Sequence, residues 1–424
     1  MFLLDGYAGT GKTYLMNVVI QYIYETTKRN ILVTAPTHKA VKVIRQYVSD
    51  SRTDFATVHS ALGLKEVIDD NGAQQFVKDL FSKCRLDQYQ FLIVDETSML
   101  EDELYEDLKI YASHGLKILF VGDSLQIPPV NKPDAIPFNK DLRKQEGIGY
   151  IKMDEIIRQA AGNPIIDYSF KIRKNIYRPI PVPDRSDCVT DQGVVALIKA
   201  KDGLRFIKEI ILPEYTSTEF STDNDHIKIL AWRNDTVDYY NDLIRAHIHG
   251  QEKLAKILPG ERLIAMEPLV EDRQTLIHNS EEMEVLDHII DEMKFGDEIM
   301  KYYYAHVNVM REDAPYTEFK VNIIHEDSED RYNELLSLQA EYAKSLPYGS
   351  YPAREAWRDF WTFKRTFFWV RYSYAITCHK SQGSTYNIAV VMENDIDASH
   401  NIYEKNRILY TACTRPRGDL VIIY

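Results

Sequence analysis

The sequence is poor in cysteine, and it has neither long apolar runs nor an excess of basic residues. No two of the four cysteines stand in a CxxC pair, so the sequence predicts neither a zinc site nor a disulfide framework. No apolar run reaches the ~18 residues that a membrane-spanning helix needs. The N-terminus lacks the basic region and the cleavage site of a signal peptide. We therefore expect reduced, buried thiols in a cytoplasmic protein.

The formal net charge of −13 over 424 residues counts against a simple nucleic-acid binder, because such proteins are usually basic overall. A motor that moves along a phosphate backbone is not excluded, because it needs only a local basic groove and must also release each phosphate. The length predicts two to three domains, at ~150 residues for each domain.

The first part of the chain, residues 1–165, alternates short apolar runs with helical stretches. The expected buried strands are Phe2–Leu4, Ile31–Thr34, Phe91–Val94 and Ile118–Val121, and the expected helices are Thr13–Glu25 and Lys39–Ser49. Such alternation predicts a doubly wound α/β domain, whose ligand sits at the carboxyl ends of the strands. A smaller insertion at about residues 61–85 contains Asn71-Gly72, a pair typical of a tight hairpin turn.

Residues 166–424 predict a second α/β domain with another parallel sheet. Its expected strands are Ile227–Ala231, Ile388–Met392 and Leu420–Tyr424. A long acidic, tyrosine-rich insertion at about residues 255–365 interrupts this domain. Two alternating runs in it, Tyr302–Met310 and Phe319–Ile324, predict β structure.

The segment Gly6-Tyr-Ala-Gly9-Thr-Gly11-Lys12-Thr13 matches the pattern GxxxxGK[ST], between an expected strand and an expected helix. Its glycines let the backbone wrap phosphates closely, and the N–H groups at the start of a helix bind negative charge. Lys12 is expected to reach the β- and γ-phosphates, and the Thr13 hydroxyl to bind Mg²⁺. Chance gives this pattern in only ~1% of chains of this length, so a coincidental turn is a poor alternative.

Two further strand ends carry polar residues suited to ATP hydrolysis. Asp95 and Glu96 follow the strand Phe91–Val94, where an acidic pair is costly unless it faces a cation. Asp95 is expected to hold Mg²⁺, and Glu96 to act as the general base. The alternative is a solvated strand end. Gln126 follows the strand Ile118–Val121 and is a candidate contact to the γ-phosphate, although a turn at this place is weak evidence alone.

The order of these motifs resembles that of superfamily-one helicases, and within them the Dda-like phage helicases related to RecD. The segment from Trp357 to Trp361 looks especially Dda-like. The motifs that carry the resemblance are Gly6–Thr13, Ala35–Ala40, Thr57–Ser60, Val94–Met99, Gly122–Val130, Glu155–Gln159, Thr377–Ser384 and Tyr410–Arg415.

The resemblance implies two RecA-like P-loop domains, with a small hairpin insertion in the first and a larger β-rich insertion in the second. It implies an ATP-dependent DNA helicase or translocase that uses ATP and Mg²⁺ and moves 5′→3′ on single-stranded DNA. Arg158 and Arg415 are then expected to be arginine fingers, because a guanidinium fork fits phosphate oxygens. Gln382 and Gly383 are expected at the nucleotide.

The DNA track implied by the resemblance runs along short hydroxyl and imidazole side chains. Phe76, just past the Asn71-Gly72 turn, is a candidate strand-separating pin, and the alternative is a Phe that packs the hairpin. Trp357, Phe360 and Trp361 are either part of a hook linking the insertion to the pin or a plain apolar core. The other expected DNA contacts are Pro36, Thr37, His38, Thr57, His59, His379, Lys380 and Ser381.

Three other functions stay open. They are a translocase that strips proteins from DNA, a RecD-like motor subunit of a larger DNA-processing complex, and a P-loop switch. Glu96 with two candidate arginine fingers argues against the switch, which needs slow hydrolysis. Expected partners are single-stranded and tailed duplex DNA, with single-stranded-DNA-binding or replication proteins, around a monomer in the host cytoplasm if the protein is phage-encoded. The family reads adenine with a Gln upstream of the first strand, where this sequence begins. The phosphate chemistry is therefore predicted but the base specificity is not.

Overall fold

The computed structural model describes residues 1–48, 52–68, 74–78, 84–129, 132–155, 162–180, 187–190, 193–251, 254–271, 274–311 and 317–424. Two predicted features, the Asn71-Gly72 turn and Arg158, lie outside the described residues. Among those that are described, no helix is long and apolar enough to cross a membrane.

The first sheet consists of six parallel strands in the order β3-β2-β6-β7-β1-β8. Alternate side chains of its central strands are buried on opposite faces, as a doubly wound sheet requires. The strands are β1 (Phe2–Gly6), β2 (Ile31–Ala35), β3 (Thr53–Thr57), β6 (Phe91–Val94), β7 (Lys117–Gly122) and β8 (Gly149–Met153). The parallel sheet predicted from the apolar runs is therefore confirmed, with β3 and β8 added.

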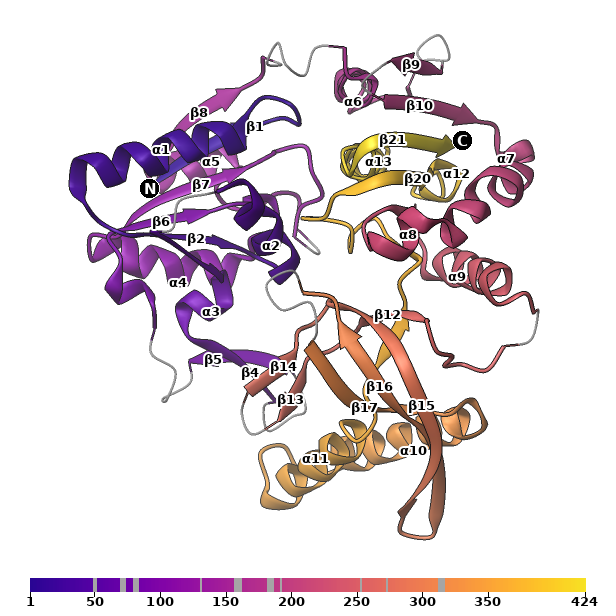
Figure 1. Cartoon of the computed structure of the whole chain (residues 1–424). Coiled ribbons are helices and arrows are strands. Elements are labelled where there is room, and N and C mark those ends of the chain that lie inside the picture. The colour runs from indigo at the N-terminus through magenta and orange to yellow at the C-terminus, as the bar shows by residue number, and fades with distance from the viewer. Residues whose placement is uncertain are drawn as a thin grey trace. The chain divides into compact units, whose positions relative to one another are not determined.

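Helices cover both faces of this sheet (Figure 1). One apolar core joins Leu3 and Leu92 to α4 through Leu104, and the other joins Leu4 to α1 through Met16. The helices are α1 (Lys12–Thr27), α2 (His38–Tyr47), α3 (Val58–Leu62), α4 (Asp102–Ser113) and α5 (Lys140–Gln145). We call this sheet with its helices the first lobe.

A second six-stranded sheet has the order β19-β11-β20-β21-β10-β9, parallel except for β9. Helices α6 and α13 pack on one face through Ile165, Tyr168 and Leu409. The strands are β9 (Cys188–Thr190), β10 (Gly193–Ile198), β11 (Ile227–Ala231), β19 (Ala375–Thr377), β20 (Tyr386–Met392) and β21 (Pro416–Ile423). The helices are α6 (Pro164–Lys174), α7 (Ala200–Phe206), α8 (Thr218–Thr222), α9 (Asn234–His249), α12 (Glu393–Ile396) and α13 (Ile402–Cys413). We call this the second lobe.

The long insertion forms a five-stranded antiparallel sheet in the order β17-β16-β15-β12-β18. Beside the expected strands it contains two long helices, which the prediction of a β-rich insertion missed. The elements are β12 (Arg262–Ala265), β13 (Leu269–Glu271), β14 (Gln274–Ile277), β15 (Glu282–Phe295), β16 (Glu298–Val309), β17 (Thr317–Ile324), α10 (Glu326–Ser345), α11 (Tyr351–Lys364) and β18 (Val370–Tyr372). Trp357 and Trp361 pack on Ala343 of α10, as in the apolar-core alternative.

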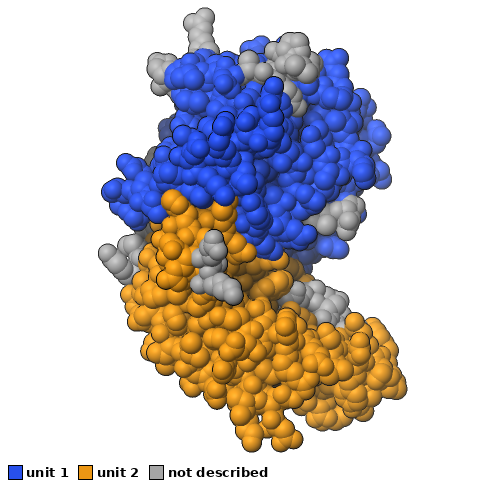
Figure 2. All heavy atoms as spheres, turned by 90° about the vertical axis from the view of Figure 1, so that its right-hand side faces the viewer, with its two compact units in different colours: residues 1–64, 78–240, 375–424 blue, residues 65–77, 241–374 orange. Residues whose placement is uncertain are grey.

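The chain divides into two compact units (Figure 2). The first unit contains both lobes: residues 1–64, 78–240 and 375–424. The second contains the antiparallel sheet, residues 241–374, together with residues 65–77. β4 (Leu64–Ile68) and β5 (Gln74–Lys78) form a two-stranded sheet, and the predicted Asn71-Gly72 turn lies between them, outside the described residues.

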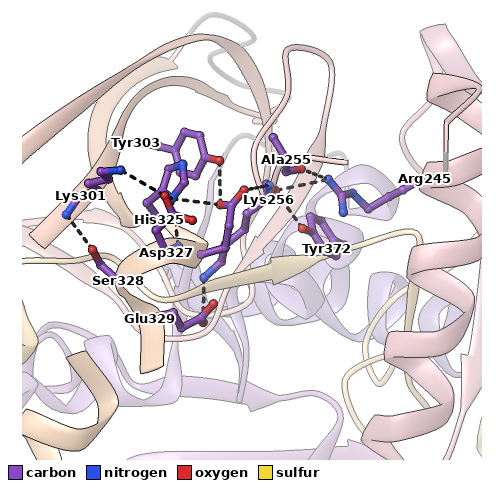
Figure 3. A network of polar contacts seen from close by, with 11 residues as sticks. Arg245, Ala255, Lys256, Lys301, Tyr303, His325, Asp327, Ser328, Glu329 and Tyr372 are labelled. Carbon is purple, nitrogen blue, oxygen red and sulfur yellow. Dashed lines mark hydrogen bonds and ion pairs between the residues drawn. The ribbon is translucent and has the colours of Figure 1, made fainter. Parts of the chain in front are cut away.

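A polar network fixes the start of α10 within the second unit (Figure 3). The Tyr303 hydroxyl of β16 donates to Glu326 at 2.7 Å, and the Lys256 ammonium lies 2.8 Å from Glu329. The Arg245 guanidinium at the end of α9 donates to the Ala255 carbonyl at 2.7 Å. Acidic residues in the first turn of a helix suit its dipole, so this network supports the long helix that the alternating strands precede.

Candidate functional site

The loop Gly6–Thr13 connects β1 to α1 in a conformation that only small residues allow. Gly9 and Gly11 have φ values of 76° and 81°, in the left-handed region. A Cβ atom on Gly6 would lie 2.7 Å from the Lys12 Cγ. The Lys12 ammonium donates to the carbonyls of Gly6 at 2.5 Å and Tyr7 at 3.1 Å, so its charge lies over the loop.

This geometry suits a bound phosphate chain. Lys12 and Thr13 form the first turn of a 16-residue helix, whose free N–H groups and dipole attract negative charge. Both side chains are half-buried at the mouth of the loop. The loop therefore has the backbone shape, the cation and the hydroxyl that the sequence pattern predicts.

Asp95 and Glu96 stand at the carboxyl end of β6. Burial, together with the neighbouring Glu96 charge, raises the pKa of Asp95 to about 7. The Asp95 carboxylate accepts the N–H of Glu96 at 2.8 Å. Glu96 has a φ of 49°, an unusual conformation for a residue with a side chain, and strain of this kind is concentrated at functional sites. The donor set of the Thr13 hydroxyl and the Asp95 carboxylate fits a hard cation such as Mg²⁺.

A third carboxylate, Asp123, follows β7 and is fully buried. Burial raises its pKa, and its Oδ1 accepts the N–H of Leu125 at 3.0 Å. Its Oδ2 accepts the hydroxyl of Tyr410 at 2.6 Å. Gln126, which closes this turn, is 5% exposed, and its Oε1 has no hydrogen-bond partner among the described residues. The sequence reasoning selected Gln126 but missed Asp123, although Gly122-Asp123 marks the strand end.

Three residues of α13 hold the turn that follows β7. Arg407 donates to the Gln126 carbonyl through Nε at 2.9 Å and Nη2 at 2.6 Å, and to Asp134 at 2.9 Å. Thr411 accepts the N–H of Ile127 at 3.0 Å, and Tyr410 binds Asp123. The two lobes therefore meet along one face of α13. Arg407 precedes the motif around Arg415, so no local signal in the sequence identified it.

The other predicted nucleotide contacts lie in the second lobe. The Gln382 amide donates to the Ile127 carbonyl at 2.9 Å, and a Cβ atom on Gly383 would lie 2.7 Å from the Ala40 Cβ. Both residues therefore face the first lobe. The Arg415 guanidinium is 5% exposed and donates to the Thr411 carbonyl at 2.9 Å. It also donates to the Ser384 carbonyl at 3.4 Å and to the Thr414 hydroxyl at 3.1 Å, so these three hydrogen bonds all stay within the second lobe.

Threonines end three parallel strands or the turns that follow them. Thr37 accepts the N–H of Ala40 at 3.2 Å, and Thr57 accepts that of Ser60 at 3.2 Å. Thr377 of the second lobe accepts the N–H of Lys380 at 3.2 Å. A hydroxyl that caps N–H groups at a helix or turn start is placed to bind phosphate oxygens as well.

Histidines accompany these caps. His38 and His59 are half-buried, burial lowers the pKa of His59, and His379 is exposed. Pro36 and Lys380 are half-buried, whereas Ser381 is fully buried and donates to the Cys378 carbonyl at 2.7 Å. Ser381 therefore supports the turn from inside.

Phe76 lies on β5 and is 52% exposed, so about half of the side chain faces solvent. An exposed aromatic side chain on this strand is compatible with the pin hypothesis.

Known proteins resemble the chain over its whole length. A family model described as an AAA domain matches residues 1–195, and one described as a UvrD-like helicase C-terminal domain matches residues 372–423. The ATP-dependent DNA helicase Dda of Enterobacteria phage T4 is 26% identical over 99% of this chain and 93% of its own. An uncharacterised protein of Acanthamoeba polyphaga mimivirus is 25% identical over 98% and 93%. The Pif1 helicase from Candida albicans superimposes with a TM-score of 0.51 and 19% identity, over 100% of this chain and 90% of that one, which shows a common fold.

Proposed function

Because the chain belongs to the superfamily-one helicases of the Dda, RecD and Pif1 type, and is therefore an ATP-dependent DNA helicase, we propose that it moves 5′→3′ along single-stranded DNA. In this proposal it unwinds duplex and displaces bound proteins. The observation that carries the hydrolytic part of the proposal is the phosphate loop with Lys12 after β1, together with the Asp95–Glu96 pair at the end of β6 in the same sheet, where β7 lies between the two strands.

ATP binds with its phosphates along Gly6, Gly9 and Gly11, whose shape admits them. Thr13 and Asp95 would hold Mg²⁺, which would supply positive charge to offset that of the phosphates. Glu96 accepts a proton from the attacking water, the water oxygen bonds to the γ-phosphorus, and the bond to the β-phosphate oxygen breaks. The products are ADP and inorganic phosphate.

The second lobe contributes to hydrolysis from across the interface. Arg415 of this lobe leaves the Thr411 carbonyl and stabilises charge on the transferred phosphoryl group. Arg158, before the domain boundary and outside the described residues, is proposed as a second finger. Gln126, whose Oε1 lacks a partner among the described residues, contacts the γ-phosphate in this proposal. Gln382 and Gly383 bring the second lobe against the nucleotide-binding one.

DNA lies along Pro36, Thr37, His38, Thr57 and His59 of the first lobe, and along His379 and Lys380 of the second, with Ser381 buried beneath. These groups hold phosphates without reading bases. When ATP closes the lobes, one grip moves past the other, and hydrolysis reopens them. Repetition of this cycle gives net movement in one direction.

The main experiment measures ATP hydrolysis by the purified chain with and without oligo-dT. A motor shows strong stimulation by single-stranded DNA. Nucleotide and DNA binding without hydrolysis would favour a subunit of a RecD-like complex that needs partners. A duplex with a 5′ tail should be unwound and one with a 3′ tail should not, and the opposite preference would overturn the direction.

Phe76 is proposed to be the pin that separates the strands. Phe76→Ala should lower the number of base pairs unwound per ATP hydrolysed, while hydrolysis on single-stranded DNA continues. Val77→Ala, at the neighbouring exposed position of β5, is the matched control. Unwinding per ATP at the wild-type value in Phe76→Ala rules out the pin.

The remaining assignments concern assembly and boundaries. We propose that the chain works as a monomer in the cytoplasm, with single-stranded-DNA-binding or replication proteins as partners. We also place the boundary of the RecA-like domains near residue 165, which is supported by the packing of α6 on the second sheet. Sedimentation of the chain with and without oligo-dT tests the monomer.

A further inference from the structure

The Tyr410 hydroxyl is buried at the point where the phosphate loop, the turn after β7 and α13 come together. Tyr410 lies on α13 of the second lobe and is 0% exposed. Its hydroxyl accepts the backbone N–H of Ala8 at 3.1 Å and donates to Asp123 Oδ2 at 2.6 Å. One O–H group thus joins three segments that are far apart in the sequence.

Each partner of this hydroxyl belongs to the hydrolytic site. Ala8 lies inside the phosphate loop, between Gly6 and Gly9, and the loop can bind phosphate only in a defined shape. Asp123 uses its second oxygen to accept the N–H of Leu125, which fixes the turn that carries Gln126. The position of Tyr410 therefore bears on both the loop and the turn.

The surroundings keep Tyr410 in place. One residue on, Thr411 binds the Ile127 N–H, and one turn earlier, Arg407 binds the Gln126 carbonyl. Ile166 of α6 also approaches the loop, because a Cβ atom on Gly9 would lie 2.8 Å from its Cδ1. Hydrogen bonds in such a dry interface are strong, and their loss leaves polar groups without partners.

We propose that Tyr410 is a positioning residue of the ATPase site, through which the second lobe holds the phosphate loop and the Asp123 turn in their active arrangement. This inference rests on the proposed function. A positioning residue affects the geometry of the transition state more than the binding of substrate. Removal of the hydroxyl alone should therefore lower kcat rather than raise KM, and it should weaken the link between hydrolysis and movement.

The test compares Tyr410→Phe with Tyr89→Phe, because both substitutions take a phenolic hydroxyl from a carboxylate. Tyr89 donates to Asp54 on β3, at the opposite end of that strand from Thr57. ATP hydrolysis is measured at saturating oligo-dT, and unwinding of a tailed duplex is measured per ATP. For Tyr410→Phe we expect kcat to fall by about 10-fold and KM to stay within about 2-fold, with fewer base pairs unwound per ATP. Tyr89→Phe should match the wild type.

Several results would overturn the inference. They are wild-type kcat and unwinding in Tyr410→Phe, a higher KM at unchanged kcat, or an equal loss in Tyr89→Phe. A double-mutant cycle with Asp123→Asn guards against a variant that folds poorly, because asparagine keeps an oxygen acceptor for Tyr410. If Tyr410 and Asp123 act together, the kcat of the double variant should be no lower than that of the poorer single variant. If the two losses in kcat multiply instead, the link is refuted. Lack of DNA-stimulated hydrolysis in the wild type would instead refute the proposed function.

Discussion

The two six-stranded sheets can be compared by strand position, β3-β2-β6-β7-β1-β8 against β19-β11-β20-β21-β10-β9, although β9 is antiparallel to its neighbour where β8 is parallel. β3 and β19, at one edge of each sheet, end alike: their last residues, Thr57 and Thr377, each accept the N–H of the residue three positions on, and a histidine follows each threonine by two positions. β1 and β10 also correspond, but β1 leads into the phosphate loop while β10 leads through Lys199 directly into α7. The proposed DNA grip is therefore built twice and the hydrolytic chemistry once, as stepping along a strand requires.

The second position in each sheet differs in another way. After β2, the start of α2 is capped by the small hydroxyl of Thr37. After β11, the Asp395 carboxylate accepts the N–H groups of Trp232 at 2.7 Å and Arg233 at 2.9 Å. The entry to α9 is thus satisfied by a carboxylate of the protein itself, whereas the start of α2 is capped by a neutral hydroxyl.

The largest expected effect comes from removing the proposed general base, Glu96, from the first lobe. Glu96→Gln should lower the DNA-stimulated kcat by about 10³-fold, because general-base catalysis contributes this order of rate. Nucleotide and oligo-dT affinity should stay near the wild type, as measured by fluorescence titration. Glu103→Gln, in the exposed first turn of α4, is the matched control. Rapid hydrolysis by Glu96→Gln would place the base elsewhere.

The second effect tests how much the Asp395 carboxylate, at the entry to α9, contributes to the free energy of unfolding. Asp395→Asn should destabilise the chain by about 3 kcal/mol, because a buried carboxylate with several donors is replaced. Hydrogen bonds from Thr236 and Arg233 outweigh burial and lower the pKa of Asp395. The carboxylate therefore stabilises the fold fully above the ordinary value of 3.8, and this contribution disappears as the pH falls through the lowered pKa. Urea unfolding at several pH values measures it. An unchanged difference between wild type and variant at low pH would contradict the assignment.

The third effect tests whether Thr57 and Thr377 contribute equally to the two proposed DNA grips. Thr57→Val and Thr377→Val should each weaken oligo-dT binding about 5-fold, which corresponds to the loss of one cap. Ser217→Ala removes a cap of the same kind at α8, where it accepts the Phe220 N–H at 3.1 Å, and should leave DNA binding unchanged. Equal losses in all three variants would show a general effect on stability.

The smallest effect concerns a single imidazole. Partial burial lowers the pKa of His59, so its ring is neutral at pH 7 and gains charge only in more acid solution. Affinity for oligo-dT should then rise as the pH falls below the ordinary value of 6.5, and the salt slope should steepen by ~0.7 for each added phosphate contact. His59→Gln should remove this rise, and a rise that persists would assign it to another group.

Fully buried strands were predictable from the sequence alone. Phe91–Val94 and Ile227–Ala231 have the predicted bounds, because short apolar runs between turn residues have few other solutions. β3 was missed, since Thr53–Thr57 mixes polar and apolar residues at an edge. Helices α10 and α11 were missed because they follow strongly alternating strands, and that pattern dominated the interpretation of the insertion.

Part of the candidate site could likewise be predicted from the sequence, and part of it could not. The phosphate loop and the Asp95–Glu96 pair are contiguous in sequence, so their chemistry can be proposed from it. The contacts of Tyr410 with Ala8 and Asp123 span 402 and 287 positions, and no local pattern encodes them. Arg407 and Asp395 are likewise defined by partners that only the folded chain brings near.

The contact between Gly383 and Ala40 leaves no room for one more carbon atom. A methyl group on Gly383 would lie 2.7 Å from the Ala40 Cβ and 3.2 Å from its Cα, at a φ of 71°. In Gly383→Ala, the added methyl group would therefore push against Ala40 and keep the two lobes farther apart. In the proposed cycle, such a variant should be impaired in the step that closes the lobes on ATP, and it should favour the open form.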